Sequence, residues 1–536
     1  MKRYSLLFVL ILLTGVIGIS PLAAQSNGSI AVYANPTTLP DLDPSSSFSN
    51  DNTVMGNAYE TLTFYNPPGS ETELSPKLAT SWEQSDDGLM WTFHLREGVK
   101  FHDGTDFNAD AVKFSIERTM SLGLGASYIF DPIDSINVVD DLTVEFNLKY
   151  TAPLDLIMAT GYAAWIMSPT AVTSNGAESS GDWFNAGNDA GTGPYMIQSY
   201  DVGQRLVATR FADYWGGWSD GQFENVVFQI AEDPTVREQL IISGGADFTY
   251  DLAWDNYPTL AETPGVTIVS NPSFQNLLAL LNHDKAPTDN LQVRQALAYS
   301  FPYEKIVENL YGGLGTQARG PVPAGMWGHD ENLFQYHQDL DMAKQLLTEA
   351  GYGDGNLTLE YTYVAGDLSE QQIGELWKAD LATIGVNLDI QGLAWEAQWD
   401  LAKNDPTTAQ DVFTFYWWPD YVTPYSFLYA MFHSENPPNF NLSYYANAEF
   451  DQLIEAGNQV SGSDKAQATD LFNQAQQMLV DDSAAIFIID LPNVHAIRDD
   501  ISGFVDNPAY PHIVFWYDLK REEFQRTRCV QSPLTV

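Results

Sequence analysis

The chain has 536 residues, of which 44% are hydrophobic and 13% aromatic, a composition that supplies a large core and excludes general disorder. Its length predicts roughly two to four structural units. Asp and Glu total 70 against 24 Lys and Arg, and the resulting net charge of −46 excludes a role in binding nucleic-acid phosphates. A single cysteine, Cys529, excludes a disulfide framework and a cysteine-based zinc or iron–sulfur site.

Residues 1–24 predict a secretory signal peptide. Two basic residues precede an apolar run over residues 6–19, and small residues follow up to Ala24. Because the run is shorter than the ~20 residues that span a bilayer, cleavage after Ala24 is favoured over an uncleaved anchor. The sequence therefore predicts a mature chain that begins at Gln25 and works outside the cytoplasm.

Strand and helix patterns alternate along the chain, which predicts a mixed α/β protein. Residues 90–96 and 142–148 alternate apolar and polar side chains and are typical of half-buried strands. Apolar residues recur at helical spacing over 340–350, and Gly351 stands where a glycine commonly ends a helix. A further helix is expected near 466–480.

A β-α-β unit is predicted in the second half of the chain. A capping-box pattern that starts at Ser369 predicts a helix, which Gly385 ends. Strand-like segments flank it at 357–364 and 386–391.

Two short motifs resemble catalytic signatures but lack the required context. Residues 217–221 match G-x-S-x-G, which would make Ser219 a nucleophile, but they lie in a polar, aromatic loop that leads into a strand at 226–230. Residues 313–318 match G-x-G-x-x-A but follow a helical pattern rather than a strand. The eight histidines show no metal-ligand spacing. The sequence predicts no catalytic residue, no metal site and no cofactor.

The richest aromatic cluster covers residues 411–421. Its first half has the composition of a strand, which Pro419 ends, and two indoles stand beside the carboxylate of Asp420. Such a strand end suits one wall of a pocket for a cationic or amphipathic ligand. The alternative, which composition alone favours, is that these rings fill core between two packed layers.

Residues 78–115 closely resemble the signature of the peptide/nickel-type solute-binding proteins of bacterial ABC importers, known as family 5. The run contains LATSWEQSDDG, WTF, LREGVKFHDG and FNADAVKFS. Further matches follow in the family's order, namely GTGPY at 191–195, GADF at 245–248, VRQALAY at 293–299 and AKQLLTEAGY at 343–352. The resemblance covers residues from about 30 to 518, nearly the whole mature chain.

The resemblance implies an α/β, two-lobed periplasmic-binding-protein-like fold with a hinge and an extra inserted domain. On that pattern the first lobe comprises residues 27–67, 190–279 and 491–536, the inserted domain residues 68–189, and the second lobe residues 280–490. The long signature then belongs to the inserted domain and serves as scaffold, so His102 and Asp103 are not taken as binding residues. The 191–195 segment would mark the return to the first lobe, where its glycines suit a chain reversal.

The resemblance also implies a ligand site. In peptide-binding relatives an aspartate in an aromatic-rich loop of the second lobe receives the ligand's α-ammonium, and Asp420 matches that position. The other ligand-binding residues that the resemblance implies are Trp417, Trp418, Tyr421, Trp395, Phe48, Ser49 and Asn50. Oligopeptide binders often hold the ligand carboxylate with an arginine or histidine between that tryptophan and the aspartate, where this chain has only Lys403.

The sequence therefore predicts a solute-binding protein, not an enzyme, that captures a peptide between two lobes and delivers it to ABC transporter permease subunits. It is expected to be a monomer in the periplasm or at the outer face of the cytoplasmic membrane, with no nucleic acid as a partner. The alternatives are an oligosaccharide or a nickel chelate as ligand and, in a different class, a secreted hydrolase that uses Ser219 or a carboxylate pair.

Overall fold

The computed structural model describes residues 30–48, 51–353, 355, 357–435, 437–511 and 513–522. The predicted signal peptide, Ser49, Asn50 and Cys529 lie outside the described residues.

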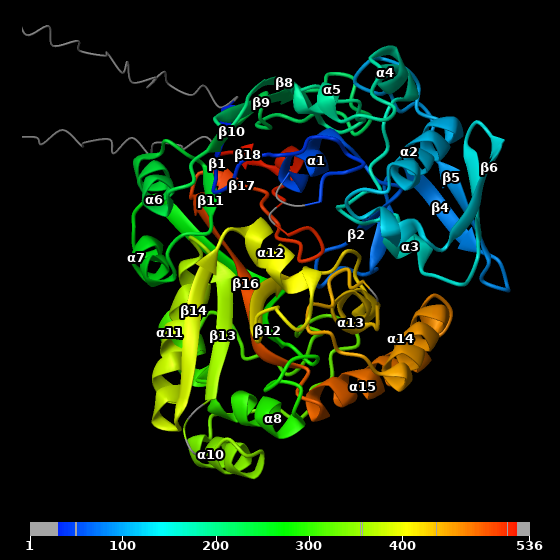
Figure 1. Ribbon diagram of the computed structural model, residues 1–536. Helices are drawn as coiled ribbons and strands as arrows, with labels where there is room; N and C mark the ends of the chain where they lie inside the picture. Colours follow the sequence, from blue (N-terminus) through cyan, green and yellow to red (C-terminus); the bar gives the residue numbers. More distant parts are fainter. Residues whose placement is uncertain are drawn as a thin grey trace, which may run out of the picture.

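A ten-stranded mixed sheet runs through the molecule (Figure 1). Its strands are β1 (Ile30–Asn35), β8 (Tyr195–Asp201), β9 (Arg205–Arg210), β10 (Asn225–Ile230), β11 (Phe248–Tyr250), β12 (Val266–Leu281), β13 (Leu357–Val364), β14 (Val386–Leu393), β15 (Val412–Trp417) and β16 (Ala485–Arg498). Their order across the sheet is β14-β13-β15-β12-β16-β11-β1-β10-β9-β8. Strands from the two ends of the chain therefore meet in the middle of the sheet.

Two long antiparallel strands, β12 and β16, join the halves of this sheet. β16 pairs with β11 toward one half, while β12 pairs with β15 toward the other. Their register shifts between Pro272 and Gln275, at the point where Pro272 lies opposite Pro492. Proline removes a ladder hydrogen bond and a bulge bends a strand, so the sheet is locally weakest here.

A separate four-stranded sheet lies to one side, in blue and cyan in Figure 1. Its strands are β4 (Ala79–Gln84), β5 (Met90–Leu95), β6 (Ile133–Asp140) and β7 (Thr143–Leu148), in the order β4-β5-β7-β6. Helix α2 (Ala109–Leu122) packs against β6 and β7. We call residues 79–150 the small-sheet region.

Shorter elements surround the two sheets in the first half of the chain. They are α1 (Asn52–Ala58), β2 (Thr63–Tyr65), β3 (Leu74–Pro76), η1 (Ser127–Phe130), α3 (Leu154–Ile157), α4 (Pro169–Ser174), α5 (Asp182–Asn185), α6 (Pro234–Ser243), η2 (Trp254–Asn256) and α7 (Tyr257–Ala261).

Most helices belong to the second half of the chain. They are α8 (Leu291–Ser300), α9 (Tyr303–Lys305), the π-helical turn η3 (Ile306–Leu310), α10 (Leu340–Glu349), α11 (Leu368–Thr383), α12 (Trp395–Asn404), α13 (Pro424–Phe432), α14 (Ala448–Ser461) and α15 (Lys465–Asp481). The last elements are β17 (Ile501–Ser502), η4 (Trp516–Asp518) and β18 (Lys520–Arg521). Within the described ranges no helix is both long and apolar enough to cross a membrane.

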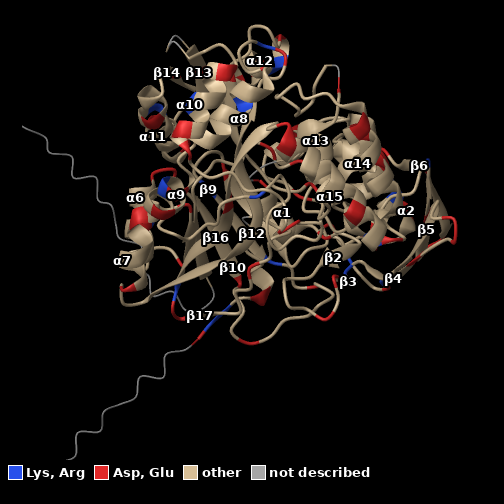
Figure 2. Ribbon diagram, turned by 90° about the horizontal axis from the view of Figure 1, so that it is seen from below, with Lys and Arg blue, Asp and Glu red and all other residues tan. Residues whose placement is uncertain are grey.

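Acidic residues are spread over helices and loops in every part of the ribbon, whereas basic residues occur in few places (Figure 2). The excess negative charge is therefore a property of the whole exterior rather than of one patch. Such a distribution favours solubility and says nothing about the fold.

The predicted strands β5 and β7 and the predicted helices α10 and α15 are confirmed. The predicted β-α-β unit is confirmed as well, because β13 pairs parallel to β14 over their full length and α11 connects them.

The start of α11 differs from the prediction. The capping residue is Asp367, whose carboxylate accepts a hydrogen bond from Glu370 N at 2.8 Å, so the capping box placed at Ser369 was wrong by two residues. Glu370 does not complete a box, since its carboxylate accepts from Val364 N at 2.9 Å. Aspartate and serine are equally good caps, and local spacing alone did not decide between them.

The glycines of the 191–195 segment serve a different purpose from the predicted chain reversal. Neither Gly191 nor Gly193 has a positive φ. A Cβ at Gly191 would lie 1.8 Å from the carbonyl oxygen of Ala58, and one at Gly193 would lie 2.5 Å from that of Asn57. The glycines are therefore needed because two backbone segments touch, and Gly193 N donates to Ala58 O at 3.0 Å.

Gly191→Ala is expected to destabilise the fold by at least the ~1–3 kcal/mol of an overpacked core, because the obstacle is backbone that cannot rotate away. Gly462→Ala is the matched control, since its Cβ would meet nothing closer than 3.6 Å. Thermal melts of the two variants check this. Equal melting temperatures would contradict the prediction and show that the backbone at the C-terminal end of α1 moves to accommodate the methyl group.

Candidate functional site

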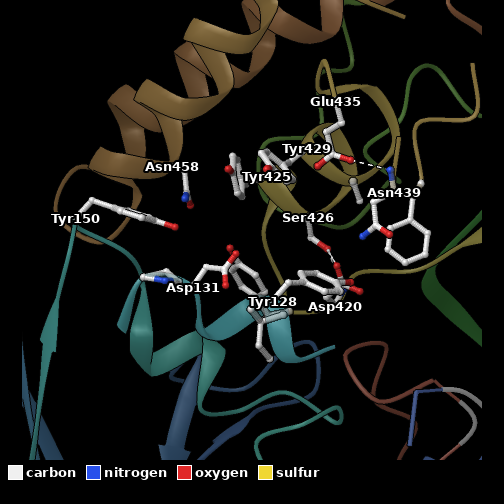
Figure 3. Close-up of a pocket in the computed structure, with 15 residues that line it drawn as sticks. Tyr128, Asp131, Tyr150, Asp420, Tyr425, Ser426, Tyr429, Glu435, Asn439 and Asn458 are labelled. Atoms are coloured by element: carbon white, nitrogen blue, oxygen red, sulfur yellow. Dashed lines mark hydrogen bonds between the residues drawn. The ribbon is translucent and has the colours of Figure 1, made fainter. Parts of the chain in front are cut away.

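A cavity of about 300 Å³ lies between the small-sheet region and residues 420–458 (Figure 3). It is lined by Tyr128, Ile129, Asp131, Pro132, Tyr150, Asp420, Tyr421, Tyr425, Ser426, Tyr429, Ala430, Glu435, Asn439, Phe440 and Asn458. Five tyrosines and three carboxylates dominate this set. The volume and the mixture of rings with a few polar groups are typical of a site for a small molecule.

Asp420 is held rigidly at the end of β15. Its backbone N donates to Ser426 Oγ at 2.8 Å, and Ser426 Oγ donates to Asp420 Oδ2 at 3.1 Å. The hydroxyl of Thr160 donates to the Asp420 carbonyl oxygen, which ties this loop to the opposite side of the cavity. Ser426 itself is fixed because it lies in the first turn of α13, which Thr423 caps. Local chain geometry thus aims the carboxylate before any ligand arrives.

Burial dominates the electrostatics of Asp420. The residue is only 5% exposed, and this burial raises its pKa to about 7, although the neighbouring Tyr128 and Ser426 hydroxyls oppose the rise. Among the described residues, the cavity lining contains no lysine, arginine or histidine. A buried carboxylate without a counter-ion is costly to ionise, so it favours any ligand that brings a cationic donor.

The raised pKa predicts a pH-dependent stability for the ligand-free protein. Between about pH 4 and 7 the unfolded chain has lost the Asp420 proton while the folded chain retains it, so stability falls as pH rises through this window. Asp420→Asn removes this loss and should be more stable than wild type above pH 7, by on the order of 4 kcal/mol. Thermal melts from pH 4 to 8 provide the measurement.

The difference between variant and wild type isolates Asp420 from other titrating groups. Asp490, on β16, is a second buried carboxylate whose pKa burial raises to about 7, and it does not line the cavity. Asp490→Asn should show the same pH trend. A constant stability difference between Asp420→Asn and wild type over the whole range would mean that Asp420 ionises normally.

Asp420 and Tyr421 are the predicted site residues that line the cavity. Phe48 lies just behind the lining, with its ring centroid 6.4 Å from that of Tyr128 and 6.3 Å from that of Phe440. Trp418 also supports the site from behind, since its Nε1 donates to the Tyr162 hydroxyl at 2.5 Å.

Two predicted tryptophans lie away from the cavity lining. Trp417 is 7% exposed and packs in the core with Phe415 and Phe440, at ring distances of 5.8 and 5.1 Å. Trp395, at the start of α12, is 43% exposed and packs on Trp399 at 5.2 Å. Lys403 lies over the ring of Trp399 at 5.8 Å, and is not part of the lining.

The sequence did not single out most of the lining residues. Tyr425 and Tyr429 had a signal, because their spacing of four just after Pro424 puts them on one helix face. Tyr128, Asp131 and Tyr150 had none, since only the tertiary packing of the small-sheet region brings them to Asp420. The resemblance had led us to treat that region as scaffold.

The family signature around His102 and the G-x-S-x-G motif lie outside the cavity lining, where their side chains make structural hydrogen bonds. His102 bonds through Nε2 to Gly193 O at 2.8 Å and through Nδ1 to Asp189, while Asp103 accepts from Ser168 Oγ at 2.6 Å. Ser219 lies in the loop before β10 and its hydroxyl bonds to the side chain of Gln222 at 3.1 Å, so the strand-turn-helix context of a nucleophile elbow does not occur there. Over the described ranges no group of three or more His, Cys, Asp or Glu side chains is arranged to hold a metal ion.

Comparison with known families identifies the fold. The model of bacterial extracellular solute-binding proteins, family 5 Middle, matches residues 73–439, more than half of the chain. The chain belongs to family 5 of the bacterial extracellular solute-binding proteins. The resemblance seen in the sequence is thereby confirmed, and so is the two-lobed α/β fold that it implied.

Relatives of this family 5 chain are similar along nearly their full length. The probable D,D-dipeptide-binding periplasmic protein DdpA of Escherichia coli K12 is 31% identical over 490 residues, 90% of this chain and 92% of that protein. Heme-binding protein A of Haemophilus influenzae is 31% identical and covers 82% of each chain. The crystal structure of the dipeptide binding protein from Pseudoalteromonas sp. SM9913 in complex with Met-Leu has a TM-score of 0.79 and 25% identity, covering 92% of this chain and all of that one.

Proposed function

We propose that this family 5 chain is the extracytoplasmic binding component of an ABC importer, and that it captures a peptide whose α-ammonium group is received by Asp420. The carrying observation is the buried Asp420 carboxylate in a cavity with no basic residue in its described lining. The bound solute would then be handed to the membrane permease, and the protein itself would catalyse no reaction. Two relatives named for dipeptides support the choice of ligand class.

An ammonium group matches this site in chemistry. It donates three hydrogen bonds, and the Asp420 carboxylate and the Tyr128 hydroxyl supply acceptors next to one another. The attraction between ammonium and carboxylate is strengthened because the tyrosine rings keep water away. Binding would also return Asp420 to its ionised form, since a nearby positive charge lowers the pKa of an acid.

Other ligands of the family fit the cavity less well. One relative is named for haem, so family membership alone does not fix the ligand. Haem would bring its own carboxylates toward Asp131, Asp420 and Glu435, and like charges repel. An uncharged oligosaccharide would leave Asp420 without a counter-charge. Haem, an oligosaccharide, a nickel chelate and a peptide differ in mass, so the mass of a ligand co-purified under native conditions distinguishes them.

The proposed capture motion is a closure about the paired strands β12 and β16, which we call the β12–β16 crossing. The lobe boundaries that the resemblance implies place this crossing, with Pro272 and Pro492, at the connection between lobes. Contacts also join the second lobe to the inserted domain, including Lys465 to Glu73 at 2.8 Å. The contact between Phe48 and Phe440 joins the second lobe to the first. Such an arrangement is what a hinge and a closing cleft require.

Closure should be visible in solution scattering. Protein stripped of ligand is expected to have a larger radius of gyration than the same protein after ligand is added, because the two sides separate when the cavity is empty. The control is Asp420→Asn at the same ligand concentration, which should stay expanded. An unchanged radius with binding confirmed by calorimetry would indicate a preformed pocket and no hinge closure.

The role of Asp420 is tested by a double cycle on protein and ligand. Asp420→Asn should weaken peptide binding by about 2–5 kcal/mol, the range for truncating one partner of a buried charge pair. N-acetylation of the peptide should weaken binding to wild type strongly but add little for Asp420→Asn. Titration calorimetry on the four combinations gives the coupling energy, and additive losses would show that Asp420 does not meet the ammonium.

Two further variants separate the site from the core. Asp490→Asn is the matched buried-carboxylate control and should keep full affinity for the peptide. Trp417→Ala should cost ~3–5 kcal/mol of stability because Trp417 is a core residue, and its effect on affinity should follow from that loss alone.

A further inference from the structure

The cavity is acidic beyond what one ammonium group needs. Besides Asp420, its lining includes the carboxylates of Asp131 and Glu435. Two basic groups lie nearby. Lys149 Nζ donates to the backbone oxygen of Asp131 at 3.0 Å and partly offsets the rise that burial causes in the pKa of the Asp131 carboxyl. His433 Nε2 bonds to Glu455 at 3.0 Å. A ligand with one positive charge would therefore leave an excess of negative charge around it.

The additional acids lie apart from Asp420. Figure 3 shows Asp131 between Tyr128 and Tyr150, toward the opposite end of the cavity from Asp420. Glu435 faces the cavity from the loop after α13. Burial is the main cause that raises the pKa of the Tyr429 hydroxyl, and the negative charges of Glu435 and Asp131 raise it further. Both carboxylates therefore act on the same side chain. The two carboxylates thus approach one region from opposite walls.

Asn458 adds an acceptor that lacks a donor. Its side chain lines the same end of the cavity and points toward Tyr150 (Figure 3). The residue is 5% exposed, and its buried Oδ1 has no hydrogen-bond partner within the described part of the chain. Leaving a buried acceptor unpaired is costly, so a donor from a ligand would be favoured at this point.

Aromatic faces complete the surroundings of this end. The rings of Tyr425 and Tyr429 lie 5.0 Å apart on α13, and the ring of Tyr150 faces them from the small-sheet region (Figure 3). Ammonium and guanidinium groups are attracted to such faces, most strongly where water is partly excluded. Carboxylate, amide oxygen and rings together are the groups expected around an organic cation.

We propose that Asp131, Asn458 and the rings of Tyr150 and Tyr425 form a second cation site, and that the preferred ligand is a peptide whose amino-terminal residue is lysine or arginine. This inference rests on the proposed function, in which Asp420 holds the α-ammonium. The side chain of that first residue then extends along the cavity to the second site, with Glu435 adding negative charge opposite. Peptides with an acidic first residue are disfavoured by the same groups.

The test compares two peptides that differ in one charge. The first residues of Lys-Ala-Ala and norleucine-Ala-Ala have side chains of the same carbon length. Both peptides carry an α-ammonium group, but only the lysine side chain ends in a second ammonium group. Wild type is expected to bind Lys-Ala-Ala roughly ten-fold or more tightly, the effect of one charge-assisted hydrogen bond, as measured by titration calorimetry. Asp131→Asn should remove this preference, so that the variant binds the two peptides with equal affinity.

Control variants separate the two sites. Asp134→Asn replaces an exposed acid three residues further along the chain, on β6 and outside the cavity lining, and should keep the preference. Glu435→Gln should reduce the preference for Lys-Ala-Ala in part, and Asp420→Asn should weaken the binding of both peptides to the same extent. Thermal melts establish that each variant is folded.

Three results would overturn the proposal. Equal affinity of wild type for the two peptides removes the second cation site and leaves the proposed peptide-binding function intact. A preference that survives in both Asp131→Asn and Glu435→Gln places the discrimination elsewhere and also overturns the assignment. If wild type binds neither peptide, the proposed function fails together with the inference.

Discussion

The site depends on one constraint: the carboxylate of Asp420 is enclosed between two parts of the chain, and the described residues that line its cavity supply no counter-charge. The loop after β15 fixes its direction through Ser426, and Thr160 on the opposite side holds its backbone. Burial raises the pKa of Asp420 to about 7, so ionising this carboxyl near neutral pH costs free energy in the ligand-free protein. A cationic ligand relieves that cost, so the same burial that weakens the empty protein favours the complex.

The sheet explains how such a site can open. Within the described ranges, β12 and β16 are the strands that join the halves of the ten-stranded sheet, and they do so with a register shift and a pair of opposed prolines. The described residues also connect the two sides of the cavity through contacts that can separate, such as Tyr421 packing into the core of the small-sheet region. A ligand that touches both walls contributes to closure, since its interactions are complete only when the walls are together.

Local patterns predicted the regular elements well, because the period of apolar residues is set by the same face that packs in the fold, as in α10 and β13. Asp420 was singled out by the two indoles beside it, and the family resemblance then favoured a ligand site over packed core. Trp417 shows why neighbours in sequence need not share a site: successive residues of a strand point to opposite sides, and Trp417 ends β15 facing the core. Asp131 and Tyr150 were beyond sequence reasoning, since no local pattern tells which distant segment will cover Asp420.

The charge of the exterior and the charge of the cavity have different consequences. Acidic residues distributed over the surface are largely screened at physiological ionic strength, and they act on how fast a cation arrives rather than on how long it stays. The carboxylate of Asp420 is shielded from salt because it is buried, so it acts on the dissociation rate, whereas Asp131 is exposed to solvent. In the proposed function, selectivity among peptides would belong to the few acids of the lining, and the net charge of −46 does not report it. The proposed class of solute therefore rests on the arrangement of Asp131, Asp420 and Glu435 rather than on composition.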